Sequence, residues 1–75
     1  TLQYYLPQNE FVTISIYDIS GKLISSLVNK NQNFGYKSVQ WNSTNNQGQR
    51  VSAGVYLYSI EAGDFRETKK MILLK

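Results

Sequence analysis

Apolar residues recur at every second position in several short segments of this chain. In the clearest of them, Val12, Ile14 and Ile16 alternate with more polar neighbours. A period of two places successive side chains on opposite faces of a β-strand, and β-branched residues suit its pleated surface. No segment shows a sustained helical period. The pattern therefore predicts an all-β chain.

Turn-forming residues divide the pattern into a series of predicted strands. These are residues 2–6, 12–17, 23–28, 36–41, 55–61 and 65–74. Pro7 ends the first strand because proline has no N–H to give to a ladder. Residues 29–33 and 42–52 are predicted loops because they are polar, and the second is rich in asparagine, glutamine, serine and glycine. The strand at 55–61 is apolar on both faces, which predicts a central strand covered on both sides.

Short strands with a turn signal about every ten residues are typical of a β-sandwich. We expect a small immunoglobulin-like or fibronectin-III-like antiparallel β-sandwich of about six to seven strands, formed as a single domain by residues 1–75. Glycines mark the predicted structural turns, at Gly21, Gly48, Gly54 and Gly63. The predicted core combines aliphatic and aromatic residues of the strands, namely Ile14, Ile16, Val39, Trp41 and Tyr56.

The residue types that the chain lacks limit its chemistry. It has no cysteine and no histidine. It therefore has no disulfide, no thiol nucleophile, and neither the commonest general base nor the commonest zinc ligand. The acidic residues lie mostly at turns or strand ends, where a solvated surface charge is the usual role. We expect a non-enzymatic module with no catalytic residue, no metal and no cofactor.

The net charge is +3, and the basic residues are spread along the chain except near its end. A nucleic-acid-binding domain usually has a denser basic patch, so no nucleic-acid partner is expected. The longest apolar run, residues 71–74, is far shorter than the roughly 20 residues that span a bilayer. The chain starts at Thr1 without a methionine, and we expect it to be the end of a longer protein.

Other functions remain as alternatives. The loop at 42–48 is rich in amide oxygens, which can bind calcium, but it contains no carboxylate, and asparagines are common in turns. Trp41 and the tyrosines could form a stacking surface for sugars if they lay exposed and coplanar, although a core role for Trp41 is the simpler interpretation. The domain could also be a structural spacer that packs on a catalytic domain of its parent protein.

The chain ends in a segment that joins lysines to apolar residues. Its members are Lys69, Lys70, Met71, Ile72, Leu73, Leu74 and Lys75. One interpretation is a final edge strand whose lysines discourage pairing with other sheets. A functional interpretation is a recognition element that a partner protein binds. These residue types alone leave both interpretations open.

Several motifs follow one another in order along nearly the whole chain. They are YYLP at 4–7, VTISIYDISGK at 12–22, WN at 41–42, Gly48, VSAGVY at 51–56, AGDF at 62–65 and TKKMILLK at 68–75. In these motifs the chain resembles the type A C-terminal sorting domain of the type IX secretion system, found at the end of many Bacteroidetes-type exported proteins. The same pattern overlaps with the immunoglobulin-like domain of flagellar hook-capping proteins.

The resemblance implies a non-catalytic signal domain at the end of a longer exported protein, with recognition carried by residues 69–75. The partners that it implies are the outer-membrane secretion apparatus and a sortase-like peptidase, besides contact with the domain's own upstream catalytic domain. The protein would pass through the periplasm and then reach the cell surface or the medium. Asn42 and Asn45 stand where sorting domains often have aspartates, so the resemblance does not extend to a bound cation.

Overall fold

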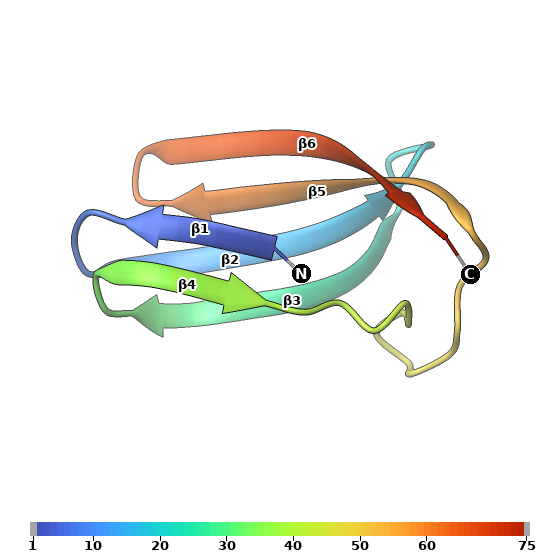
Figure 1. Cartoon of the computed structure of the whole chain (residues 1–75), viewed down its shortest axis with the longest axis horizontal. Helices are drawn as coiled ribbons and strands as arrows, with labels where there is room; N and C mark the ends of the chain where they lie inside the picture. The colour runs from blue at the N-terminus through green and yellow to red at the C-terminus, as the bar shows by residue number, and fades with distance from the viewer. Residues whose placement is uncertain (1, 75) are drawn as a thin grey trace.

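The computed structural model describes residues 2–74 as two layers of antiparallel strands (Figure 1). The strands are β1 (Leu2–Leu6), β2 (Glu10–Asp18), β3 (Leu23–Gln32), β4 (Gly35–Val39), β5 (Gly54–Ala62) and β6 (Phe65–Leu73). β1 and β4 form a two-stranded sheet, and the other four strands form a sheet in the order β3-β2-β5-β6. The predicted all-β antiparallel sandwich is confirmed. The described residues form no helix, and so none that could cross a membrane.

The core lies between the two sheets and is centred on β2. Val12, Ile14 and Ile16 of this strand are fully buried. Ile14 pairs with Ile60 on β5 and with Val28 on β3, so that three buried aliphatic side chains meet in one row across the sheet. Each fully buried aliphatic side chain of this size stabilises the fold by about 1.5–3 kcal/mol. The alternation in β2 is therefore the main source of apolar burial.

The turn from β2 to β3 is organised by one carboxylate. Oδ1 of Asp18 accepts hydrogen bonds from the backbone N–H groups of Ser20, at 3.0 Å, and Lys22, at 2.9 Å, and from the Ser20 hydroxyl, at 2.6 Å. Gly21 has a φ of 93°, a conformation that glycine adopts without a steric cost. The hydrogen bonds from the Ser20 side chain and the Lys22 backbone lower the pKa of Asp18.

β3 departs from the sequence prediction in two ways. Its pairing with β2 shifts register twice, which leaves Ile24 and Leu27 without a partner in the ladder and lets both pack against the core. The predicted loop at 29–33 is wrong, because β3 continues to Gln32. These polar residues remain in the strand because their backbones pair with the first half of β2, from Glu10 to Thr13.

β5 is central in its sheet but is not covered on both sides, so that this prediction is wrong. Tyr56 and Ile60 face the core, whereas Val55 and Glu61 on the other face are exposed. The second sheet lies on one face of the four-stranded sheet, and within residues 2–74 no other layer covers the opposite face. The apolar side chains on that outer face therefore stay in contact with solvent.

The burial of Ile14 generates a matched test of the core. Ile14→Val should lower the free energy of unfolding by about 0.5–1.5 kcal/mol, because it removes one methylene from a fully packed site. Ile19→Val makes the same change at a side chain that is 78% exposed, and it should change the free energy of unfolding by less than about 0.5 kcal/mol. Urea unfolding measures both values. Equal losses in the two variants would contradict the assigned core.

The Asp18 turn generates a pH prediction. Because the folded-state pKa of Asp18 lies below the ordinary value of 3.8, its hydrogen bonds stabilise the fold fully above that value. This contribution is lost as the pH falls through the folded-state pKa. Asp18→Asn keeps an acceptor oxygen but does not titrate, and it should flatten the decline of stability with acid. Urea unfolding between about pH 2 and pH 6 tests this, and parallel curves for both proteins would refute it.

Candidate functional site

The predicted recognition segment forms the second half of β6, the outermost strand of the four-stranded sheet. β6 pairs with β5 along its whole length and with no other strand among residues 2–74. Its outer edge therefore carries backbone donors and acceptors that no strand satisfies. Lys75, the last residue of the predicted segment, lies outside the described residues.

The two faces of this segment have different roles. Met71 pairs with Tyr56 and Leu73 pairs with Gly54, and both side chains pack against the core. Lys70 and Ile72 alternate with them and point to the outer face of the sheet, where both are exposed. Half of the apolar residues in the segment are therefore structural and are not available to a partner.

The two neighbouring lysines also differ. Nζ of Lys69 lies 3.1 Å from Oε1 of Glu67, and this hydrogen-bonded ion pair raises the pKa of Lys69. The other ion pair among residues 2–74 joins Arg66 to Glu61. Lys70 therefore has no ion-pair partner within the described part of the chain. Of the two, Lys70 is the lysine whose charge is available to a partner.

The glycines predicted at turns have positive φ angles and lie at Gly21, Gly48, Gly54 and Gly63. Gly54 is the first residue of β5 rather than part of a tight turn. Gly63 closes the β5–β6 turn with a φ of 60°, and a Cβ at this position would lie 2.5 Å from Oε2 of Glu10. Glycine at position 63 thus lets the Glu10 carboxylate approach the β5–β6 turn.

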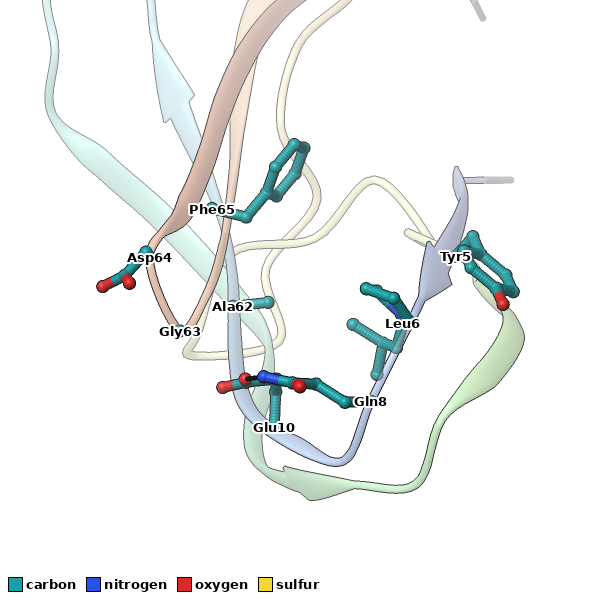
Figure 2. Close-up of a pocket in the computed structure, with 9 residues that line it drawn as sticks. Tyr5, Leu6, Gln8, Glu10, Ala62, Gly63, Asp64 and Phe65 are labelled. Atoms are coloured by element: carbon teal, nitrogen blue, oxygen red, sulfur yellow. Dashed lines mark hydrogen bonds between the residues drawn. The ribbon is translucent and has the colours of Figure 1, made fainter.

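Glu10 and Gly63 both line a cleft that the sequence did not predict. The cleft lies between the end of β1 and the β5–β6 turn (Figure 2), and its volume is about 510 Å³. Leu6 and Phe65 lie on its two sides, and Gln8 and Glu10 lie along its rim, where the Gln8 amide donates to Glu10 Oε1 at 2.6 Å. Its walls come from segments far apart in the chain, so no local pattern could reveal it.

The cleft offers packing rather than reactive chemistry. Phe65 is exposed although it lies on the core side of β6, where it pairs with the buried Ala62 and lines the cleft. Within the described residues, acidic side chains do not gather in groups of three that could hold a metal ion. An apolar side chain would fit this hollow beside the hydrogen-bonded Glu10.

The predicted core residues are buried to different degrees. Ile14, Ile16 and Tyr56 are buried, whereas Val39 and Trp41 are partly buried and pack against them. The Trp41 ring lies edge-on to Tyr56, with centroids 5.2 Å apart and planes at 70°. Its indole N–H donates to the Thr44 carbonyl at 2.8 Å. Trp41 is thus held in place by the fold, with its ring partly buried against the core.

The asparagines of the long loop bind their own backbone. Oδ1 of Asn45 accepts from the N–H groups of Gln47, at 3.0 Å, and Gln49, at 2.9 Å. Oδ1 of Asn46 accepts from the Ser26 N–H at 3.0 Å, which ties the loop to β3. These amide oxygens already have donors, as expected for side-chain to backbone turns.

Tyr5 and Tyr36 form the exposed aromatic pair of the two-stranded sheet. They are directly paired across β1 and β4, with ring centroids 4.8 Å apart and planes tilted by 52°. Both rings are exposed. Because of the tilt, the pair does not form one flat surface of the kind that the carbohydrate alternative requires.

Comparison with known proteins identifies one family. The model of the FlgD Ig-like domain matches residues 1–64 of the chain. The matched part contains β1 to β5 and most of the turn that follows, and it ends just before β6. No curated protein and no solved structure matches the chain.

The contacts of Trp41 generate a prediction for this site. Trp41→Phe keeps an aromatic ring but leaves the Thr44 carbonyl without its donor, and should cost about 1–2 kcal/mol of unfolding free energy. Tyr36→Phe is the control, because this ring is 88% exposed and should change stability by less than about 0.5 kcal/mol. Circular dichroism should follow the unfolding, since the substitution removes the tryptophan. A neutral Trp41→Phe would refute the structural role.

Proposed function

This chain belongs to the FlgD Ig-like domain family, and on that premise we propose that it is a non-catalytic sorting module of the type IX secretion system. In this proposal the domain ends a longer exported protein. The outer-membrane secretion apparatus binds it after the protein reaches the periplasm, and a sortase-like peptidase removes it. The cargo then stays at the cell surface or enters the medium.

The observation that carries the proposal is the position of the C-terminal segment. It forms an outermost strand with an unpaired edge, and it exposes Lys70, Ile72 and Leu74. An exposed strand edge can add a strand of a partner through main-chain hydrogen bonds, while the neighbouring side chains provide specificity. The segment is thus accessible to a receptor without unfolding of the domain.

The sequence motifs add a second line of support. The motif TKKMILLK, through which the chain resembles sorting domains, occupies residues 68–75. The family match ends at residue 64, so that this motif lies beyond the part shared with the Ig-like family model. In this proposal β1–β5 provide the general scaffold, and the motif typical of sorting domains lies on the last strand.

An export assay tests this function. A fluorescent reporter with a signal peptide is fused in front of the complete chain and produced in a host with a type IX apparatus, and in the same host without it. The proposal expects the reporter at the surface or in the medium of the first host and in the periplasm of the second. An identical distribution in both hosts would reject the sorting function and favour a structural spacer.

The control is the same reporter without the domain, which should remain in the periplasm of both hosts. Deletion of residues 69–75 is a weaker control than the sequence alone indicates. It would remove Met71 and Leu73, which pack against the core, so that a loss of export could reflect unfolding.

A further inference from the structure

The outer face of the four-stranded sheet, which is turned away from β1 and β4, has two chemically different halves. Paired residues of neighbouring strands share a face, so the register defines rows that cross the sheet. One half consists of two polar rows, namely Ser26-Ser15-Ser59-Thr68 and Asn29-Thr13-Glu61-Arg66. Phe11 lies at the far end of this half.

The other half is apolar. Tyr17 pairs with Leu23 on β3 and with Leu57 on β5, and Val55 pairs with Ile72 on β6. These five residues form what we call the outer apolar patch. Leu23, Val55 and Ile72 are exposed, and Tyr17 and Leu57 are partly buried. An exposed apolar surface drawn from four strands is typical of an interaction site rather than of scattered surface residues.

Lysines accompany this patch. Lys70 pairs with Leu57 in the same row and has no ion pair within residues 2–74. Lys22 is exposed and directly precedes Leu23. Asp18 directly follows Tyr17, and its carboxylate interacts electrostatically with Lys22. Within residues 2–74, Lys70 is therefore the lysine beside the patch that supplies an unpaired positive charge. The patch therefore combines an apolar centre with positive charge.

We propose that the secretion machinery recognises the outer apolar patch together with Lys70 as one folded surface, rather than residues 69–75 as a linear signal. This inference rests on the proposed sorting function and specifies its contact surface. The occupant is a protein surface with an apolar centre and carboxylates. Burial of Lys70 against such a partner requires an opposite charge, because an unpaired buried ammonium is costly.

The inference changes which residues carry the signal. Of the C-terminal segment, Lys70 and Ile72 contribute to the surface, whereas Met71 and Leu73 hold the strand on the core. Leu23 and Leu57 contribute although they lie far outside the segment in the sequence. A recognition surface of this kind exists only when β2, β3, β5 and β6 are paired.

The test uses the complete reporter fusion in the host with the type IX apparatus. Leu23→Thr and Leu57→Thr keep residue types suited to strands and leave residues 69–75 unchanged. Each should reduce the exported fraction by about tenfold, the effect of losing one well-buried contact. Phe11→Thr is the matched control, because Phe11 is 51% exposed and Leu23 is 47% exposed on the same face. It should export as the unchanged fusion does.

A second pair of variants tests the charge. Lys70→Glu should reduce export by about tenfold or more, because it places a like charge against the carboxylates of the partner. Lys30→Glu makes the same charge change at an exposed position of β3 outside the patch, and should have no effect. Thermal unfolding of each purified fusion separates a lost contact from a lost fold. The charge variants keep the test decisive if Leu57→Thr fails to fold.

The outcomes separate the two proposals. Normal export of folded Leu23→Thr and Lys70→Glu variants would overturn the folded surface while the sorting function stands. Selective loss of export in the patch variants, with folded controls exported, supports it. If the unchanged fusion does not depend on the apparatus, the sorting function fails, and the inference that rests on it fails with it.

Discussion

The buried face of β2 is the constraint on which the rest of this structure depends. The chain has 75 residues and no cysteine, so no disulfide supports its small apolar core. Val12, Ile14 and Ile16 are the largest fully buried side chains, and β2 is the strand that pairs with both β3 and β5. The two-stranded sheet closes this core through Leu2 and Leu6. Any function that the domain performs has to leave this arrangement intact.

The sequence predicted what is local in this fold and missed what depends on pairing. The alternation of β2 and the turn at Gly21 were visible because each is encoded by adjacent residues. The extension of β3 to Gln32 was not, because backbone pairing with β2 holds it rather than apolar side chains. The bulges that turn Ile24 and Leu27 toward the core disturb the alternation from which strands are recognised.

The candidate site shows the same division. The apolar run at 71–74 has no visible inner and outer face in the sequence, and only its register with β5 separates Met71 from Ile72. The cleft beside Phe65 and the patch around Leu57 both join strands that are distant in the chain. In the amide-rich loop, the side chains of Asn45 and Asn46 already accept hydrogen bonds from backbone N–H groups. The proposed binding therefore uses sheet surfaces and a strand edge. Many immunoglobulin-like domains instead bind through their loops.

The position of β6 also decides which end of the domain suits a fusion partner. Ile72 lies beside Val55 at the end of the last strand, and Leu74 follows within solvent. A purification handle or a passenger protein attached after residue 75 would be joined to the strand that carries these side chains. The same addition in front of β1 would start on the other sheet. The two ends of the domain are therefore not equivalent in a fusion protein, and a passenger protein belongs on the N-terminal side.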